Sequence, residues 1–466
     1  MGPQPRPAGA VLSSNPSATG PASMMELRFQ DKDASRIIGE LVGRETERCA
    51  VMLASRVAWP GMDRLVVSSL DFPADENYSD RSLISAQLKP EYIAQIGKRA
   101  ASQNLSAVFV HSHPGSAPPE FSKIDDDGEA HLARFLSVRA PDTVHGAVVV
   151  SAGGWCARRL GEKTPMRVVS VGPQLQVLFD DADGSGPPSL KFDRQVRALG
   201  SAGQKYLESL TVAIVGLGGT GSIAAEQLAH LGVRKFILID PDRIETTNLN
   251  RVAGSRIGDV NRFKTDVAAE MVAGITPGAA CKSIIGDVTR TAIARELRAA
   301  DFIFSCTDSH GSRAVIQQIA YQYLIPCVDM GSIITARAGQ IAGVHGRVQA
   351  LAPRLPCFTC CGLLDSEEVR RDMMNAEERS RDQYIQGAHE PAPAVISING
   401  TVTSMAITMF LAMMVGVPSA ARHLIYDVRL PSLRAVSFTS NPNCYVCSSR
   451  GVLARGDSQD LFTRDD

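Results

Sequence analysis

The sequence predicts two consecutive folded units, an α+β domain followed by an α/β domain built on a parallel, Rossmann-like sheet. Three observations predict this arrangement. The chain has 466 residues, about three times the length of a typical domain. An Asp-, Gly-, Ser- and Pro-rich stretch at 180–188 separates two segments of different character. Strands and helices follow no regular order before this stretch, whereas after it strand and helix alternate, as crossover connections in a parallel sheet require.

Apolar runs give the elements of the first domain. The segments at 49–54 and 65–70 predict strands, and further strands are expected at 106–111 and 144–151, with a helix at 90–103. The order of two strands, a helix, a strand, a loop, a helix and a strand is typical of an α+β domain.

The second domain alternates at the spacing of a doubly wound sheet. We expect strands at 210–215, 235–240 and 302–306 and helices at 220–232 and 264–275.

Composition changes along the chain set the expected domain boundaries. Residues 1–23 are rich in Pro, Gly, Ser and Ala, which predicts a disordered leader without the apolar segment of a signal peptide. We expect the first domain at 24–178, a linker at 179–189, the second domain at 190–450 and a polar tail at 451–466.

The composition excludes several classes of protein. The 48 basic and 49 acidic residues give a net charge of −1, so no electrostatic argument favours a nucleic-acid or membrane-surface partner. Ten cysteines are too few for a disulfide scaffold, so we expect them to serve metal binding or catalysis in a reducing cytoplasm. The longest apolar run, at 402–417, contains hydroxyl side chains and predicts a buried helix rather than a membrane span.

Two histidines at the end of an expected strand indicate a metal site. His111 and His113 are two residues apart in an extended segment, so both imidazoles can face one ion. Asp125 could supply a third ligand, which would leave a fourth position open for water, as in a catalytic zinc site. The water would need a carboxylate base. Glu47, just before the first expected strand, is the candidate, with Glu45 as the alternative.

The order of these residues resembles a known enzyme family. Glu47, the segment HSHP at 111–114 and the segment SKID at 122–125 are together similar to the JAB/JAMM (MPN+) metallopeptidases, which process ubiquitin-like proteins. The resemblance implies catalytic zinc on His111, His113 and Asp125, general acid and base catalysis by Glu47, and oxyanion stabilisation by Ser122. The interval between the two segments is one residue longer than the family usually shows, and Asp126 or Asp127 could replace Asp125 as the ligand.

A glycine-rich loop follows the first strand of the second domain. Gly216-Leu-Gly218-Gly219-Thr-Gly221 stands between an expected strand and an expected helix, where glycines allow backbone N–H groups to approach a phosphate. Asp240, at the end of the next strand, could accept hydrogen bonds from a ribose. Dinucleotide-dependent dehydrogenases and many methyltransferases share this pattern, so the loop alone does not decide the reaction.

Several polar residues around the loop favour phosphate chemistry over hydride transfer. They lie in Asp240-Pro-Asp242, in Asn248-Leu-Asn-Arg251, at Lys264, in Ser305-Cys-Thr-Asp308 and in Phe192-Asp-Arg194. Charge builds up on the α-phosphate and on leaving pyrophosphate when the bond between them breaks, and Arg, Lys and Mg²⁺ stabilise that charge. Asp308, at the end of a strand, is suited to hold Mg²⁺.

This set of residues resembles the ubiquitin-activating enzyme superfamily, including its ThiF/MoeB-like bacterial members, which activate sulfur-carrier proteins. The resemblance implies a homodimer that uses ATP and Mg²⁺ to adenylate the C-terminal glycine of a ubiquitin-like protein. It assigns nucleotide binding to Gly216, Gly218, Gly219, Gly221, Asp240 and Asp242, phosphate contacts to Asn248, Arg251 and Lys264, Mg²⁺ to Asp308, and the γ-phosphate to Arg194 of a second copy.

Two CxxC pairs form a second metal signature. Cys357-Phe-Thr-Cys360 and Cys444-Tyr-Val-Cys447 have the spacing of one closed four-cysteine zinc site, which contributes to folding rather than to chemistry. A redox-active pair is the alternative, but four cysteines in two turns favour zinc.

No cysteine occurs between residues 362 and 443, where ubiquitin-type activating enzymes carry a catalytic cysteine in a crossover loop. Cys361 adjoins the zinc pair and is a weak substitute. Ser397, Thr401 and Ser404 are conceivable oxygen nucleophiles, but nothing in the sequence activates them. We therefore expect adenylation without an obligatory thioester on this chain.

Together the two domains predict an enzyme that trims or releases a ubiquitin-like modifier and also adenylates its terminal carboxylate. The expected partners are the ubiquitin-like protein and a conjugating enzyme or sulfur-transfer protein. Conjugation ranks narrowly ahead of thiocarboxylate formation on a sulfur carrier. An FAD- or NAD-dependent oxidoreductase and a non-catalytic binding scaffold are the alternatives from other classes.

Overall fold

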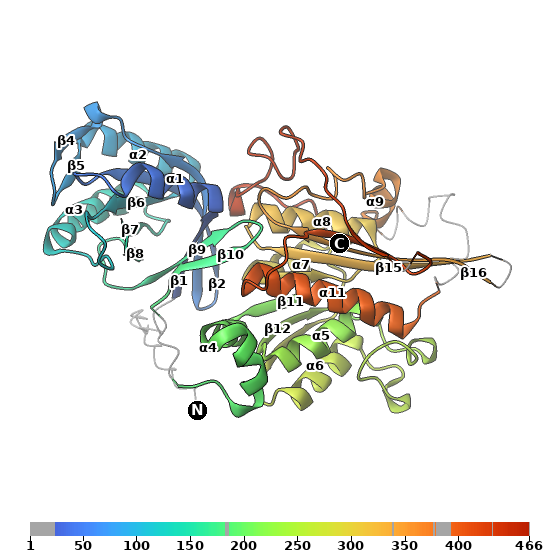
Figure 1. The fold of residues 1–466 in the computed structure, drawn as a ribbon. Helices are drawn as coiled ribbons and strands as arrows, with labels where there is room; N and C mark the ends of the chain where they lie inside the picture. The colour runs from blue at the N-terminus through green and yellow to red at the C-terminus, as the bar shows by residue number, and fades with distance from the viewer. Residues whose placement is uncertain are drawn as a thin grey trace, which may run out of the picture.

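The computed structural model describes residues 24–181, 186–337, 340–375, 378, 393–430 and 432–465. An N-terminal half, residues 24–181, and a C-terminal half, residues 186–465, pack side by side (Figure 1). The leader expected at 1–23 and residues 182–185 of the expected linker lie outside the described residues.

The elements of the N-terminal half agree with the predicted ones where the sequence is continuously apolar. They are β1 (Met24–Gln30), α1 (Asp31–Leu41), β2 (Cys49–Trp59), β3 (Met62–Asp71), β4 (Tyr78–Arg81), β5 (Ala86–Leu88), α2 (Pro90–Gln103), β6 (Ser106–Ser112), α3 (Lys123–Arg139), β7 (Gly146–Ser151), β8 (Gly154–Arg159), β9 (Met166–Val171) and β10 (Leu175–Phe179). The four predicted strands correspond to β2, β3, β6 and β7, and α2 has the predicted bounds. β1, α1, β4, β5 and β8 to β10 are additional elements.

One mixed sheet, in the order β10-β9-β1-β3-β2-β6-β7-β8, forms the N-terminal half. Successive residues of a strand point to opposite faces, and β2 shows the consequence. Its Met52 packs on one face with Ile37 of α1, whereas its Val51 packs on the other face with Ile96 of α2 and Leu136 of α3. Helices therefore cover both faces of the sheet.

The two ends of this sheet approach each other. Arg158 of β8 forms a bridge with Pro165, the residue before β9, so the sheet is barrel-like. The β4–β5 hairpin forms a separate two-stranded sheet. It is attached to the end of β2, where the N–H of Cys49 donates a hydrogen bond of 2.9 Å to the hydroxyl of Tyr78.

The C-terminal half confirms the predicted alternation of strands and helices. Its elements are α4 (Asp193–Ser209), β11 (Thr211–Val215), α5 (Gly219–Leu231), β12 (Lys235–Ile239), α6 (Lys264–Ile275), β13 (Ala280–Ile284), α7 (Thr291–Ala294), β14 (Phe302–Ser305), α8 (His310–Gln322), β15 (Cys327–Arg337), β16 (Gln340–Leu351), α9 (Ser366–Asp372), α11 (Ile396–Met414), β17 (His423–Asp427) and β18 (Ser432–Ala435), with short 3₁₀ helices that include η3 (Thr246–Asn248) and η7 (Gly456–Ser458).

The sheet of the C-terminal half is doubly wound. Its strand order is β13-β12-β11-β14-β15-β16-β17-β18, parallel from β13 to β15 and antiparallel from β15 onward. The order reverses between β11 and β14, which are neighbours in the sheet. Ligands of such sheets bind outside the carboxyl ends of the strands at this reversal, so the fold itself predicts the position of the site.

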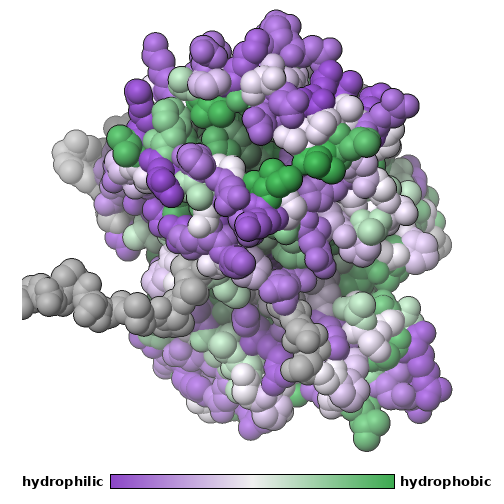
Figure 2. Space-filling view, turned by 90° about the vertical axis from the view of Figure 1, so that its left-hand side faces the viewer, coloured by the Kyte–Doolittle hydropathy of each residue, from purple (hydrophilic) through white to green (hydrophobic). Residues whose placement is uncertain are grey.

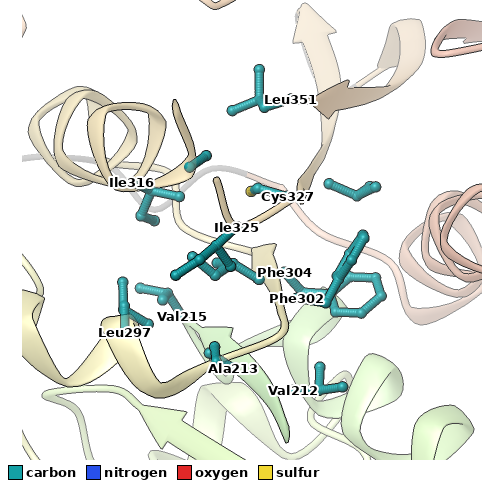
Figure 3. Close-up of a cluster of buried hydrophobic side chains, with 14 of the residues drawn as sticks. Val212, Ala213, Val215, Leu297, Phe302, Phe304, Ile316, Ile325, Cys327 and Leu351 are labelled. Carbon is teal, nitrogen blue, oxygen red and sulfur yellow. The ribbon is translucent and has the colours of Figure 1, made fainter. Parts of the chain in front are cut away.

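The core of the C-terminal half surrounds the central strands. Phe302 and Phe304 of β14 lie among aliphatic side chains from neighbouring strands and helices (Figure 3), and the rings of Phe302 and Phe410 stand 4.8 Å apart. Phe410 belongs to α11, which alone among the helices of the described residues is long and apolar enough to cross a membrane. Because Phe410 and Val402 of this helix are fully buried, α11 is the core helix predicted at 402–417.

One apolar cluster extends across both halves. Val57, Val66 and Val169 of the N-terminal half belong to the same buried cluster as Leu207 and Leu210 of the C-terminal half. The two halves therefore share a core.

The last described residues pack against α8. The N–H of Ala454 donates to the carbonyl of Tyr321 at 3.0 Å, and the side chain of Gln322 donates to the carbonyl of Gly456 at 2.8 Å. The expected polar tail thus lies along this helix.

Candidate functional site

The metal-binding pattern of the N-terminal half converges at the end of β6. His111 is the last residue but one of this strand, His113 follows the strand directly, and Asp125 lies in the first turn of α3. β2 pairs with β6 so that Cys49 stands opposite His111. This register brings Glu47, two residues before Cys49, to the same end of the sheet.

The ligand atoms of this cluster lie at the spacing of a metal site. His111 Nε2 is 3.0 Å from Asp125 Oδ1 and 3.2 Å from His113 Nε2, and His113 Nε2 is 3.5 Å from Asp125 Oδ2. Ligand atoms around tetrahedral zinc, with bonds of about 2.0–2.1 Å, stand about 3.3 Å apart. The three side chains therefore fit a zinc ion, and Glu47 Oε1 lies beside them, 3.8 Å from His113 Nε2.

The environment of each group in this cluster shifts its pKa. Burial raises the pKa of Glu47, although His111 and His113 oppose the shift. The hydrogen bond with Asp125 raises the pKa of His113. Burial disfavours the ionised form of Asp125, but hydrogen bonds from both histidines and from the N–H of Ser122 outweigh it and hold the pKa of Asp125 below its usual range. The carboxyl of Asp125 therefore favours its ionised form, whereas the pKa of the neighbouring Glu47 carboxyl is raised.

Ser122 caps α3 and positions Asp125. Its N–H donates to Asp125 Oδ2 at 2.6 Å, and its hydroxyl oxygen accepts from the N–H of Asp125 at 3.2 Å. Within the described residues, the hydroxyl hydrogen of Ser122 has no acceptor. Of the alternatives considered from the sequence, Asp126 pairs with Arg158 at 2.7 Å, and Asp127 and Glu45 are exposed.

A cavity of about 300 Å³ opens beside the metal cluster. Its lining combines polar side chains of the cluster with apolar ones: Glu47, His111, Asp125, Ile84, Leu88, Ile93, Phe109, Ile124 and Leu132. Figure 2 looks at the side of the molecule where β4, β5 and α3 lie, and it shows apolar residues gathered around a hollow there. An extended apolar segment of a substrate could therefore lie next to the cluster.

The glycine loop of the C-terminal half is packed too tightly for side chains at most of its positions. Gly216 has φ 89°, and a Cβ there would lie 2.7 Å from the carbonyl oxygen of Cys306. A Cβ at Gly221 would overlap the carbonyl oxygen of Gly216. At Gly218, the N-cap of α5, a Cβ would meet no atom within 4 Å. Open space thus remains at the N-terminus of α5, where the helix dipole favours an anion.

Arg251 and Asn399 flank this loop. A Cβ at Gly219 would contact the amide of Asn399 and lie 3.6 Å from Cδ of Arg251. Arg251 Nη1 donates to the carbonyl of Thr247 at 2.6 Å, which holds the cation beside the loop. Asn399, in the first turn of α11, accepts a hydrogen bond of 2.9 Å from Ser332. No sequence motif marks Asn399 or Ser332, because only the packing of α11 brings them here.

Asp240 directly follows the neighbouring strand β12, and Lys264, the first residue of α6, lies beside it. Asp240 is 4% exposed and accepts from the N–H groups of Leu217 and Asp242 at 2.6 and 2.8 Å. Burial raises the pKa of Asp240, although Lys264 and these N–H groups oppose the shift. Lys264 Nζ lies 2.7 Å from Asp242 and 3.9 Å from Asp240. Asn248 is buried, and its side-chain oxygen caps η3.

Asp308 lies at the reversal of strand order, three residues after β14 ends. Its side chain is exposed, and within the part of the chain that the structure describes its carboxylate makes no hydrogen bond or ion pair. Both oxygens are therefore available, and carboxylate oxygen is the ligand that Mg²⁺ prefers.

Within one chain, Arg194 lies far from the glycine loop. It is exposed on α4, and the adjacent Gln195 donates to the carbonyl of Leu231, at the C-terminal end of α5. The glycine loop is at the other end of that helix, roughly 18 Å away at 1.5 Å per residue. An Arg194 that contacts the nucleotide would have to come from a second copy.

The two CxxC pairs meet in one cluster. Cys357 Sγ lies 3.6 Å from Cys444 Sγ, and Cys360 Sγ lies 3.5 Å from Cys447 Sγ. Sulfur atoms around tetrahedral zinc, with bonds of about 2.3 Å, stand about 3.8 Å apart. The N–H of Asn441 donates to Cys360 Sγ at 3.3 Å, as suits a thiolate acceptor. The four side chains fit a zinc ion that would tie the segment after β18 to the segment after β16.

The chain matches the ThiF family model over residues 192–446, which is more than half of its length. The SAMP-activating enzyme E1 of Haloferax volcanii is 26% identical over 256 residues, which cover 54% of this chain and 86% of that protein. The molybdopterin-synthase adenylyltransferase of Salmonella typhimurium is 25% identical over 270 residues, covering 57% of this chain and 99% of that protein.

Two further similar proteins also match slightly more than half of this chain. The sulfur carrier protein ThiS adenylyltransferase of Escherichia coli is 26% identical over 268 residues, covering 55% of this chain and 94% of that protein. Among solved structures, E. coli MccB with MccA-N7isoASN has a TM-score of 0.46 at 18% identity, covering 56% of this chain and 76% of that one. On the match over residues 192–446, with its glycine loop, doubly wound sheet and four-cysteine cluster, the chain belongs to the ThiF family.

Proposed function

We propose that this chain is an adenylyltransferase that uses ATP and Mg²⁺ to activate the C-terminal carboxylate of a ubiquitin-like protein. One observation carries the proposal. Four features gather at the carboxyl edge of one parallel sheet: the exposed carboxylate of Asp308, the cations of Arg251 and Lys264, and the open N-terminus of α5. The printed names of three relatives, an activating enzyme and two adenylyltransferases, support the same reaction.

Each residue at this edge of the sheet would have a separate role in adenylation. A carboxylate oxygen of the substrate attacks the α-phosphorus, and the bond to pyrophosphate breaks. Mg²⁺, when bound, neutralises charge on the phosphate oxygens, and Asp308 is the residue that would hold it. Arg251 and Lys264 stabilise charge that grows on the phosphates. Arg194 of a second copy would contact the γ-phosphate, which makes the homodimer the catalytic unit.

The fate of the adenylate follows from the missing cysteine. Since residues 362–443 contain no cysteine, we propose that the adenylate passes directly to a conjugating enzyme. Transfer of sulfur to the carboxylate of a sulfur carrier is the second candidate, favoured by the name of the ThiS adenylyltransferase relative. The central part of the crossover region, residues 379–392, lies outside the described residues.

For the N-terminal half we propose zinc-dependent cleavage of the C-termini of ubiquitin-like proteins. The observation that favours it is the cluster of two imidazoles and a carboxylate with a buried glutamate beside it, at the edge of an apolar cavity. His111, His113 and Asp125 would hold zinc, which supplies Lewis-acid chemistry to a bound water and carbonyl. Glu47 would take a proton from the attacking water and give one to the leaving amine. Ser122 would donate its hydroxyl hydrogen to the developing oxyanion.

ATP–pyrophosphate exchange tests the adenylation. We expect exchange that depends on a ubiquitin-like protein with a C-terminal glycine, that is lost in Asp308→Ala and that persists in His113→Ala. The absence of exchange in the wild-type chain with every such protein would refute it.

Cleavage of a peptide fused to the C-terminus of the same protein tests the second activity. Here His113→Ala should be inactive, whereas His131→Ala, which changes a histidine of the same cavity outside the cluster, should retain cleavage. Equal cleavage activity in the two variants would contradict the proposed zinc mechanism.

A further inference from the structure

A buried carboxylate lies directly beneath the nucleotide site. Asp329 of β15 is fully buried. It pairs in register with Ser305, the last residue of β14, and accepts a hydrogen bond of 2.8 Å from the hydroxyl of that serine. A buried carboxylate costs free energy unless it is paired and hydrogen-bonded. The partners of Asp329 therefore indicate what the carboxylate does in the fold.

Two arginines approach Asp329 from different elements. Arg313 of α8 donates from Nε to Oδ1 at 3.1 Å, and Arg347 of β16 donates from Nη2 to Oδ2 at 2.6 Å. The side chains of the two arginines are 14% and 19% exposed. Two cations therefore share one carboxylate, and the cluster carries a net positive charge next to the expected phosphates.

Arg313 links this carboxylate to the nucleotide site. Its Nη1 donates to the backbone carbonyl of Asp308 at 3.3 Å. The guanidinium is planar, so a bond from Nε to Asp329 also fixes the direction in which Nη1 points. Arg347 has no such link, because its Nη1 donates to Gln349 instead.

We propose that Asp329 is a positioning residue for the nucleotide site, acting through Arg313. By orienting Arg313, it holds the turn at 306–309 so that the carboxylate of Asp308 faces Mg²⁺·ATP. Asp329 touches neither substrate nor metal in this account. The proposal rests on the proposed function in needing Mg²⁺·ATP at this edge of the sheet, and it deepens that function by naming what sets the geometry of its metal ligand.

Calorimetric titration of the full-length protein with ATP over a range of Mg²⁺ concentrations tests this role. In Asp329→Asn and Arg313→Lys we expect the Mg²⁺ concentration for half-maximal ATP affinity to rise roughly tenfold, as when a residue behind a metal ligand is lost. The ATP affinity measured in EDTA should stay at the wild-type value, because the glycine loop is untouched. Arg347→Gln is the matched control, since it removes the other cation from Asp329 but leaves the contact between Arg313 and Asp308.

Three results would overturn the proposal: wild-type Mg²⁺ dependence in both variants, an equal loss of ATP affinity with and without Mg²⁺, or the same shift in Arg347→Gln. If Asp329→Asn does not fold, Arg313→Lys decides, because it keeps the charge and removes only the planar fork. Should the wild-type chain fail in ATP–pyrophosphate exchange while these variants still shift the Mg²⁺ dependence of ATP binding, the positioning role would stand and the adenylation of ubiquitin-like proteins would not.

Discussion

Arg28 of the N-terminal half donates a hydrogen bond of 2.6 Å to Asp301 of the C-terminal half, and its side chain is 1% exposed. The same network includes Arg64, which donates to the carbonyl of Arg298 at 2.7 Å, and Glu26, which pairs with both Arg28 and Arg64. Burial opposes the ionised form of Glu26, but the neighbouring arginines outweigh it and hold its pKa well below the usual range. The two halves therefore meet through a buried ionic network as well as through a shared apolar core.

Breaking this network should destabilise both halves together. In Asp301→Ala, the buried arginines Arg28 and Arg64 would lose one of their carboxylate partners and keep Glu26. We therefore expect the free energy of unfolding to fall by about 3–5 kcal/mol. Arg354→Gln is the control, because the pair between Arg354 and Asp31 also joins the halves but is largely exposed. It should cost about 0–1 kcal/mol. Denaturant unfolding followed by circular dichroism measures both, and two separate transitions in the wild-type chain would contradict a shared core.

Two glycines of the nucleotide loop should respond differently to alanine. Gly221→Ala should lower the melting temperature, because the new Cβ would overlap the carbonyl oxygen of Gly216. Gly218→Ala should leave the melting temperature unchanged but weaken ATP binding by roughly tenfold, which is about 1.4 kcal/mol, since its methyl group would stand where we expect the phosphates. Gly258→Ala, also in open space, is the control for both measurements. If Gly218→Ala binds ATP with the wild-type affinity, the phosphates do not bind at this position.

The zinc content of purified protein should separate the two metal clusters. We expect two zinc ions per chain in the wild type and one in His111→Ala, which loses a ligand at the N-terminal cluster. Cys444→Ser should lose the other ion and melt at a lower temperature, because a structural zinc contributes to folding. Elemental analysis by mass spectrometry gives the count. Two zinc ions per chain in His111→Ala would show that the N-terminal cluster holds no metal.

Stability should depend on pH through His145. This side chain is buried and accepts from the N–H of Ala107 at 3.0 Å, and burial lowers the pKa of His145 from 6.5 to about 4. The unfolded chain therefore binds more protons between these values, so stability is full above pH 6.5 and falls as the pH drops toward 4. The loss should reach the order of 3 kcal/mol, at about 1.4 kcal/mol per pKa unit.

A variant isolates this contribution. In His145→Asn the amide oxygen can still accept from Ala107 but does not titrate, so the slope of unfolding free energy against pH should become smaller. It should not vanish, because burial also lowers the pKa of His423 to about 4. An unchanged slope in His145→Asn would assign the pH dependence to other groups.

The sequence predicts the central elements of the C-terminal half, which are β11, α5, β12, α6, β14 and α11. It does not predict α4, β13, α7, α8, α9 or the strands from β15 to β18. The central strands of this half are buried on both faces, so they form continuous apolar runs such as that of β14. In β1, by contrast, Glu26 and Arg28 interrupt the apolar pattern. Arg28 is buried against Asp301, more than 270 positions away, and Glu26 is buried against Arg28. A charge that is buried by a distant partner has no local signal in the sequence.

Some residues of the candidate sites could likewise be predicted from the sequence, and others could not. The convergence of His111 and His113 could be predicted because their spacing in an extended segment sets their common direction. The position of Glu47 depends on the register between β2 and β6, which the resemblance supplied and the local pattern did not. Asp329 could not be predicted at all, since in the sequence it is a single acidic residue in an apolar strand.

The most direct test of the central claim is the mass of a ubiquitin-like protein after incubation with this chain, ATP and Mg²⁺. We predict that its C-terminal glycine gains the mass of an adenylyl group in the presence of the wild-type chain and of His113→Ala, and that it gains none with Asp308→Ala. An unmodified C-terminus with the wild-type chain, or an adduct that forms equally with Asp308→Ala, would contradict the account.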